Sequence, residues 1–378
     1  MTFKLKPLLA GATMMLAAGT ANADQLSFAG GWPPNSAPTG KLEDFAAAVE
    51  EYSGGDVTVK VYPLSLLSFA EASAGVRDGI ADMTANLMAY FPAEFSHFNM
   101  LAEFSEVVEL EQFASDRSSF AFSGAIMEYV INSCPDCMDQ IAAQNQVYLG
   151  ASSTTSYVLQ CVVPLATVDD LKGKRIRAAG AYWARWAEQV GAVPVSMSIN
   201  ETLEGLNQGV VDCTASNTAD FVNFGFIDVV KYLYVGLPGA QFNVPYTMNR
   251  DSWNSLSDEN KSAMLKATAK LAADIAWVYT EEAAAGKERA PGEGIEYGAA
   301  SEELVAMNRE FIAKDKDAIG EIYKERFQIE TGAAAATALT DLMVKWTDLT
   351  KDLDSAEALA DVYWTEVLSK VDVATYGK

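Results

Sequence analysis

The segment from Asp169 to Asn217 constrains the fold of this chain more than any other part of it. Its apolar residues recur at strand and helix spacing in the order strand, helix, strand, helix, strand. We expect the first strand to end at Arg177, the second to cover 193–197 and the third 210–214. Parallel strands joined by helices bring their carboxyl ends to one edge of a sheet, where ligands bind.

Arg177 falls at that edge, just before the start of a helix through Tyr182 and Trp186. A guanidinium makes two parallel hydrogen bonds with a carboxylate, and a helix N-terminus adds free N–H donors and a partial positive charge. The segment therefore predicts half of a binding site for a small carboxylate. The alternative is a surface arginine paired with Asp169 or Glu188.

The same order of elements recurs near the N-terminus. The expected elements are a strand at 26–29, a helix at 41–52, a strand at 57–61, a helix opened by the capping box Ser68-x-x-Glu71, and a strand at 80–86. Gly79-Ile-Ala-Asp82-Met-Thr resembles Gly209-Val-Val-Asp212-Cys-Thr at an offset of 209 − 79 = 130 residues. We interpret the matched Asp82 and Asp212 as structural residues that hold a strand or turn.

The repeat favours an α/β protein of two similar domains with mostly parallel sheets. We expect lobe I to comprise 24–147 and 239–290, and lobe II to comprise 148–238 and 291–330. Helices in 331–378 are expected to pack across the lobes. Short crossings between the lobes suit a hinge that closes a cleft on a ligand.

Capping residues and apolar spacing predict where the remaining helices begin. Asn200 is expected to cap the helix that carries Leu203 and Leu206. Ser257 should begin a helix that runs to about Lys287, followed by a short strand at 292–297. Further helical segments are expected from Ser301, Ala333 and Ser355.

Residues 1–23 read as a secretory signal peptide, with Lys4 and Lys6, an apolar run at 8–19 and the cleavage site Ala21-Asn22-Ala23. The apolar run is too short to span a bilayer, which disfavours an uncleaved anchor. We therefore expect export to the periplasm. Loss of two lysines takes the formal charge from −24 to −24 − 2 = −26, which disfavours nucleic acid and anionic membranes as partners.

Four cysteines in an oxidising compartment are expected to form disulfides. Cys134 and Cys137 could close a small loop, and Cys161 and Cys213 fall on strand-like runs near the proposed site edge and could pair across neighbouring strands. Thiol redox chemistry at Cys134-Pro-Asp-Cys137 is the weaker alternative, since this motif does not open a helix after a strand.

Signatures of catalysis are few. His97 is the only histidine, and the Gly-x-Ser-x-Gly, Walker A and Gly-x-Gly-x-x-Gly motifs are absent. No dedicated metal site is expected, since there is one Cys-x-x-Cys and one His, and no cofactor is expected. A carboxylate-only hydrolase remains as an alternative, because such enzymes need only two acids at a set separation.

Several ordered motifs together resemble the extracytoplasmic solute-binding proteins of tripartite ATP-independent periplasmic (TRAP) transporters, of the dicarboxylate-binding type. They are Asp170-Leu-Lys-Gly-x-x-Ile-Arg177, Gly191-Ala-x-Pro-Val, Glu201 with Gly209-Val-Val-Asp212, and Val76-Arg-Asp-Gly-x-Ala-Asp82-Met. The resemblance implies two α/β domains, a long helix spanning both from near Ser257, and closure on an organic acid paired with Arg177. It also implies the membrane subunits of a TRAP transporter as partners, and we expect a monomer. The receptor of an ATP-driven importer, or a sensor, is the alternative with the same fold.

Two departures from the family pattern bear on the ligand. Many members continue after the Asp212 position with Gly-Gln-Glu-Asn-Pro, whereas this chain reads Cys213-Thr-Ala-Ser-Asn217. The resemblance therefore places the polar pocket contact on Asn217 or Ser216. Many also have a second arginine where this chain has Ser153-Thr-Thr-Ser-Tyr-Val, which favours a monocarboxylate with an apolar or aromatic body. Further candidate contacts are Trp32, Asn86, Tyr90, Trp183 and Phe242. The alternatives are that Asn217 caps a helix, that Trp183 packs in the core and that Asn86 bonds at a strand end.

Overall fold

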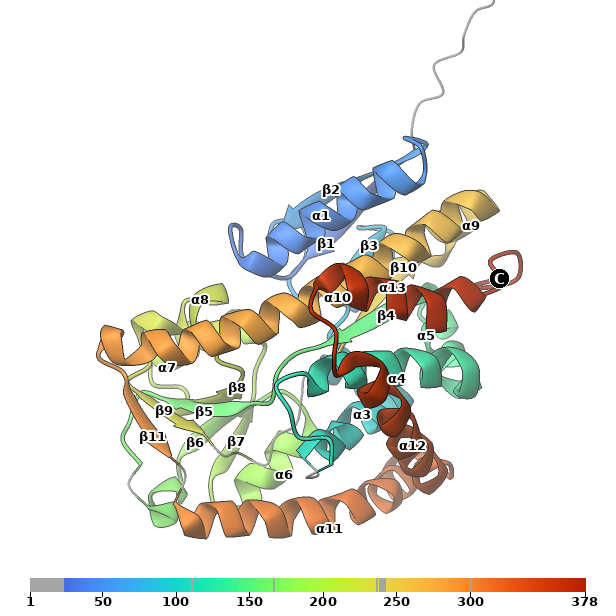
Figure 1. The fold of residues 1–378 in the computed structure, drawn as a ribbon. Helices are drawn as coiled ribbons and strands as arrows, with labels where there is room; N and C mark the ends of the chain where they lie inside the picture. The colour runs from blue at the N-terminus through green and yellow to red at the C-terminus, as the bar shows by residue number, and fades with distance from the viewer. Residues whose placement is uncertain (1–23, 110–111, 166, 236, 238–242, 300) are drawn as a thin grey trace, which may run out of the picture.

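The computed structural model describes residues 24–378 except 110–111, 166, 236, 238–242 and 300. The expected signal peptide and the candidate contact Phe242 lie outside the described residues. Figure 1 shows helices around two sheets that lie side by side, with the long α10 running past both.

The first sheet has the strand order β2-β1-β3-β10-β4. Its strands are β1 (Asp24–Gly30), β2 (Val57–Pro63), β3 (Met83–Ala85), β4 (Gln146–Ser153) and β10 (Asn243–Asn249). β1 is parallel to β2 and β3, whereas β10 is antiparallel to β3 and β4.

The second sheet has the order β11-β9-β5-β8-β6-β7. Its strands are β5 (Val158–Cys161), β6 (Arg175–Ala178), β7 (Val193–Ser196), β8 (Cys213–Ser216), β9 (Tyr232–Val235) and β11 (Glu296–Ala299). β6 is parallel to β7 and β8, β11 is parallel to β9, and β5 runs antiparallel to β8 and β9. Both sheets are therefore mixed, and the predicted two-domain α/β binding-protein fold is confirmed.

The α-helices pack around these sheets. They are α1 (Ala37–Tyr52), α2 (Ala72–Arg77), α3 (Ser96–Glu103), α4 (Ser118–Ser133), α5 (Pro135–Ala143), α6 (Ala181–Gln189), α7 (Ile199–Asn207), α8 (Asp220–Asn223), α9 (Arg250–Ser255), α10 (Asp258–Arg289), α11 (Glu302–Phe327), α12 (Gly332–Thr350) and α13 (Ala356–Glu366). The 3₁₀ helices are η1 (Met88–Tyr90), η2 (Phe104–Glu109), η3 (Val168–Leu171), η4 (Phe226–Asp228), η5 (Ala290–Glu293) and η6 (Leu368–Lys370).

Element boundaries differ from the expectations where turns compete with strands. β8 begins at Cys213 rather than Val210, because Gly209 (φ 65°) turns the chain and the N–H groups of Val210 and Val211 donate to the carbonyl of Gly205. For the same reason β3 is shorter than the predicted strand at 80–86. The Ser68–Glu71 hydrogen bonds form (2.7 and 2.9 Å), but α2 starts only at residue 72. The strand predicted at 292–297 is η5 followed by β11.

The matched aspartates Asp82 and Asp212 each tie the start of one strand to its parallel neighbour. Asp82 accepts hydrogen bonds from the backbone N–H and the hydroxyl of Ser27 on β1 (both 2.7 Å). Asp212 accepts from the backbone N–H (2.8 Å) and the guanidinium of Arg175 on β6. These contacts agree with the structural interpretation of the repeat.

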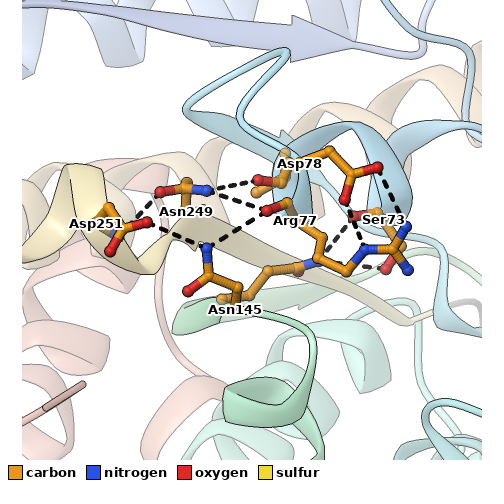
Figure 2. A network of polar contacts seen from close by, with 8 residues as sticks. Ser73, Arg77, Asp78, Asn145, Asn249 and Asp251 are labelled. Carbon is orange, nitrogen blue, oxygen red and sulfur yellow. Dashed lines mark hydrogen bonds and ion pairs between the residues drawn. The ribbon is translucent and has the colours of Figure 1, made fainter.

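A polar network fastens the corner where α2, β4 and α9 meet (Figure 2). Asn249 donates to the carbonyls of Val76 (2.8 Å) and Arg77, and its side-chain oxygen caps α9 by accepting from Asp251 N (2.9 Å). Asn145 also donates to the carbonyl of Arg77. These hydrogen bonds join the end of α2, the start of β4 and the start of α9.

The helix α10 has 32 residues, about 48 Å at 1.5 Å per residue. Ser257 caps it by accepting a hydrogen bond from Asn260 N (3.1 Å), as predicted. It packs on α1, β4 and α13 at one end and reaches α8 and η5 at the other, so it extends along both sheets as the family resemblance implied.

The lobe boundaries remain a proposal. The expected crossing after residue 147 falls inside β4, which pairs with β10 in the first sheet, so we place that crossing between β4 and β5. The C-terminal helices pack on first-sheet elements, with the Tyr363 hydroxyl donating to the Phe120 carbonyl (2.7 Å) and Trp346 Nε1 donating to Glu128 (2.7 Å).

A buried ionic cluster joins three helices. Arg185 on α6 pairs with Glu103 on α3 (2.7 Å) and with Asp315 on α11, and Glu103 also accepts a hydrogen bond from Tyr323. Glu106 lies nearby in η2, fully buried, and burial raises its pKa to about 9. Since α3 belongs to the first-sheet region and α6 to the second, this cluster holds the two regions together.

Both cysteine pairs form disulfides. Cys134 at the N-cap of α5 is bonded to Cys137, and Cys161 on β5 is bonded to Cys213 directly opposite on β8. Cys213 is the first residue of β8, so the second disulfide lies at the end of that strand away from Ser216, and not near the site edge as expected.

Removing the two disulfides should have unequal effects on stability. Replacing Cys161 and Cys213 by alanine opens a loop with a sequence separation of 52, against 3 for Cys134 and Cys137. Loop entropy predicts a loss in the free energy of unfolding of about 4 kcal/mol for the first pair and about 2 kcal/mol for the second. Urea denaturation of the two double variants compares them, and equal losses would contradict the prediction.

Candidate functional site

A cavity lies between the two sheets (Figure 1), and strand ends form much of its wall. Trp32 follows β1, Leu87 follows β3, Arg177 lies near the end of β6 with Ala179 just after it, and Asn217 follows β8. Its lining combines aromatic and aliphatic side chains with a few polar groups, as is usual for small-molecule sites. The cavity thus lies at the edge of the sheets where the sequence placed a binding site, and that it binds a ligand stays a prediction.

Arg177 is the buried cation of this cavity, with 1% of its surface exposed. Its Nε donates to the carbonyl of Met197 (3.0 Å), one Nη1 hydrogen to the carbonyl of Ala215 (3.5 Å) and one Nη2 hydrogen to the hydroxyl of Tyr90 (2.9 Å). Within the described part of the chain, no ion pair joins Arg177 to a carboxylate. A guanidinium has five N–H donors, so donors remain on both terminal nitrogens for another acceptor.

Asp220 lies in the same cavity at the start of α8 and is 4% exposed. Burial raises the pKa of its carboxyl to about 7, although the charge of Arg177 and a hydrogen bond from Ser216 lower it in part. The Ser216 hydroxyl in turn accepts from Gln160 Nε2 (2.8 Å).

Aromatic rings form the apolar part of the wall. Trp32 donates through Nε1 to the hydroxyl of Tyr279 on α10 (2.8 Å) and packs edge-on against Phe69, with ring centroids 5.0 Å apart. Tyr157, from the segment between β4 and β5, lines the cavity with one side and stacks on Trp183 with the other (5.4 Å). Such walls suit a flat or apolar ligand body.

Four of the predicted contacts come together in this cavity: Trp32, Tyr90, Arg177 and Asn217. Three others do not line it. Asn86 is buried in the first sheet and donates to Gln146 (3.2 Å), Ser216 bonds to Gln160 and Asp220 behind the wall, and Trp183 packs behind Tyr157 beside a neighbouring cavity. These are the strand-end and core alternatives stated above.

The sequence-based reasoning missed Asp220, Tyr157 and Tyr279. Asp220 had a usable signal, because it follows β8 by four residues and so stays near the sheet edge. Tyr157 also had one, because it lies in the segment that crosses from the first sheet to the second. Tyr279 had no usable sequence signal, because the helical pattern of α10 does not indicate which buried face lines the cavity.

Hydrogen bonds across the cavity join the two sides. The Tyr90 hydroxyl, from η1, accepts from Arg177 and from the backbone N–H of Ile199 (2.8 Å). Asn200 donates to the carbonyl of Gly31 (2.8 Å) and accepts from Phe69 N (3.2 Å). Asn200 therefore does not cap α7 as expected; Ser198 is the N-cap, in a capping box with Glu201.

Among the described residues, no cluster of His, Cys, Asp and Glu is arranged to hold a metal ion. None of the helices in the described part of the chain is both long and apolar enough to cross a membrane.

A family model described as bacterial extracellular solute-binding protein, family 7 (DctP), matches residues 28–329. The chain belongs to this family. Membership confirms the resemblance stated above and the expected periplasmic location. A solute-binding protein of Albidiferax ferrireducens is 24% identical over 70% of this chain and 77% of its own length.

Solved structures share the family-7 fold. A marine metagenome TRAP solute-binding protein specific for aromatic acid ligands, crystallised with 3-hydroxybenzoate, has a TM-score of 0.73 at 20% identity, over 86% of this chain and 99% of that one. A TRAP periplasmic solute-binding protein of Bordetella bronchiseptica with bound (R)- and (S)-mandelate has a TM-score of 0.70 at 21% identity, over 85% and 99%.

Replacing Asn200 by alanine should loosen contact between the two sides of the family-7 fold. The variant loses two hydrogen bonds to the Gly31 and Phe69 backbone, each worth about 1 kcal/mol, so the ratio of closed to open molecules should fall about 30-fold. Small-angle scattering without ligand should show a larger radius of gyration than for the matched variant Asn254→Ala, whose side chain is exposed and far from the cavity. An unchanged radius would argue against this role.

Asp220 should make stability depend on pH. Its native pKa of about 7 lies above the ordinary 3.8, so the folded state binds the extra proton between these values. Stability associated with Asp220 is full below pH 4 and is lost as the pH rises through 7. In thermal melts from pH 4 to 8, the midpoint of the wild type minus that of Asp220→Asn should fall steadily; a flat difference would refute the raised pKa.

Proposed function

We propose that this protein is the solute receptor of a TRAP-type transporter and captures a small organic anion for secondary-active uptake. The observation that carries the proposal is Arg177, which is buried at the cavity and has terminal N–H donors to spare. A buried guanidinium without a partner anion is costly, and a ligand carboxylate supplies that anion.

Binding follows from the geometry around this group. The carboxylate of the ligand accepts from Arg177, while Trp32, Tyr157 and Tyr279 enclose the ligand body. Closure of the two sides excludes water, which strengthens the charge-assisted hydrogen bonds at the buried end. The contacts made by Tyr90 and Asn200 across the cavity stabilise the closed form.

The ligand class that fits best is a monocarboxylate with an apolar or aromatic body. The cavity wall is rich in aromatic rings, and Arg177 is the only arginine or lysine among the described residues that line it. Structures of the same fold, described above, bind aromatic acids and mandelate. A dicarboxylate would leave its second charge without a cation.

A receptor role also accounts for what surrounds the cavity. Among the described residues that line the cavity, Asp220 is the only Asp or Glu. Hydrolysis by carboxylates needs two acids at a set separation, so this cavity suits binding better than hydrolysis. We propose that the protein is not an enzyme, that it acts as a monomer, and that it delivers its ligand to the membrane subunits of the transporter. Family membership supports this over an ATP-driven importer.

Replacing Arg177 by alanine should weaken carboxylate binding by at least about 100-fold, because two charge-assisted hydrogen bonds are lost. Calorimetry with acids found in a thermal-shift screen measures the effect. Arg175→Ala is the matched control: it changes the same strand, but its guanidinium is exposed and paired with Asp212. Arg175→Ala should retain wild-type affinity. Unchanged affinity in folded Arg177→Ala would refute the assignment.

A further inference from the structure

The disulfide between Cys134 and Cys137 lies at the start of a helix and close to the protein surface. Cys134 is the N-cap of α5, so the Cys-Pro-Asp-Cys motif opens a helix, although it follows α4 and not a strand. Cys134 is 7% exposed, whereas Cys137 is fully buried, and the residues at 132–133 and 135–136 are all exposed. Of the two cysteines only Cys134 contacts solvent, so an attacking reagent approaches this bond from the Cys134 side.

The N-terminus of α5 can stabilise a negative charge on the Cys134 sulfur. This sulfur accepts a hydrogen bond from the backbone N–H of Cys137 (3.2 Å), one of the N–H groups that the first turn of a helix leaves without an intrahelical partner. Helix N-termini carry a partial positive charge and favour the thiolate form of cysteine. When the disulfide is reduced, a Cys134 thiolate therefore has a donor already in place.

The acidic residue within the motif has a partner of its own. The carboxylate of Asp136 is largely exposed and faces His97 on α3, with Oδ2 and Nε2 3.5 Å apart. Nδ1 of His97 lies 3.0 Å from Gln140 Nε2, an amide donor, so the hydrogen on Nε2 of His97 faces Asp136. This contact and the surrounding solvent weaken the repulsion between Asp136 and a thiolate on Cys134.

The second disulfide provides a contrast within the same chain. Cys161 and Cys213 are both fully buried and lie directly opposite each other on β5 and β8. Neither lies at the start of a helix, and exchange at this bond requires the sheet to open first. The two disulfides therefore differ in access and in thiolate stabilisation, which are two of the properties that govern the rate of thiol–disulfide exchange.

We propose that the Cys134–Cys137 disulfide is a thiol–disulfide exchange site that is reduced by a dithiol, whereas the Cys161–Cys213 disulfide is purely structural. The inference does not depend on the proposed function, because neither Cys134 nor Cys137 lines the cavity. The solvent-exposed side of the bond receives the dithiol, and the helix start stabilises the thiolate that the exchange releases.

The exchange balances with the dithiol as the only co-reactant. One thiolate of the dithiol attacks Cys134 Sγ and forms a mixed disulfide, while the bond to Cys137 breaks and Cys137 leaves as a thiolate that takes up a proton from solvent. The second thiolate of the dithiol then attacks its partner sulfur in the mixed disulfide and releases Cys134 as a thiolate at the helix start. The dithiol gives up two electrons and becomes a disulfide, and the protein disulfide becomes two cysteines.

The kinetics of reduction in the folded, full mature chain test this site. The protein is exposed to dithiothreitol in native buffer and quenched with N-ethylmaleimide, and mass spectrometry follows the labelling of each pair. The Cys134–Cys137 pair should be labelled at least about tenfold faster than the buried pair, because its reduction needs no opening of a sheet. Circular dichroism should show that the protein stays folded after this first reduction. Equal rates for the two pairs, both set by global unfolding, would overturn the proposal.

Two matched variants identify the reactive sulfur. Cys137→Ala leaves Cys134 at the helix start and Cys134→Ala leaves the buried Cys137, so both variants lose the same disulfide. With dithiodipyridine, a neutral aromatic disulfide, Cys137→Ala should react at least about tenfold faster than Cys134→Ala. Equal or reversed rates would contradict the role of Cys134. If either variant does not fold, the two labelling rates in the wild-type chain decide.

Discussion

A buried guanidinium is the constraint on which this structure depends. Arg177 is held by carbonyl groups of its own sheet region and by the hydroxyl of Tyr90 from the opposite side. Because a buried charge is stable only when it is hydrogen-bonded and balanced by a counter-charge, the surrounding strand ends must supply acceptors and leave space for an anion. β8, η1 and the segment after β7 supply these acceptors through Ala215, Tyr90 and Met197.

The matched aspartates Asp82 and Asp212 help to fix the positions of the strand ends around Arg177. Asp82 and Asp212 each bond to the first strand of their own repeat, so the carboxyl ends of β1 and β3, and of β6 and β8, are set at defined heights. Trp32 and Leu87 on one side, and Arg177 and Asn217 on the other, then meet across the cavity. A short sequence repeat thus supports the geometry of a site that it does not itself line.

Much of this could be predicted from local sequence signals. Apolar periodicity predicted the strands and helices around Arg177, and Ser257 and Ser301 marked helix starts that the structure confirms. Those signals act within a few residues, which is why they are readable. Asn200 shows the limit: a residue that resembles a helix cap instead bonds to Gly31, 169 positions away, and only the packed fold brings the two together.

Pocket residues on long helices are the least predictable. Tyr279 lies in the middle of α10, where nearly every turn is buried against something, so burial alone cannot single it out. Asn86 and Trp183 show the opposite error, because their residue types suit ligand binding but neither lines the cavity. Asn86 bonds within the first sheet, and Trp183 stacks on Tyr157 behind the cavity wall.

The hydroxyl oxygen of Tyr90 connects the anion site to the other side of the cavity. The Tyr90 hydroxyl accepts from the group that awaits an anion and from the backbone at the start of α7. Because Arg177 has further N–H donors on both terminal nitrogens, an anion can bind there while the Tyr90 hydroxyl keeps both contacts, so the anion site and the start of α7 share one hydrogen-bonded residue.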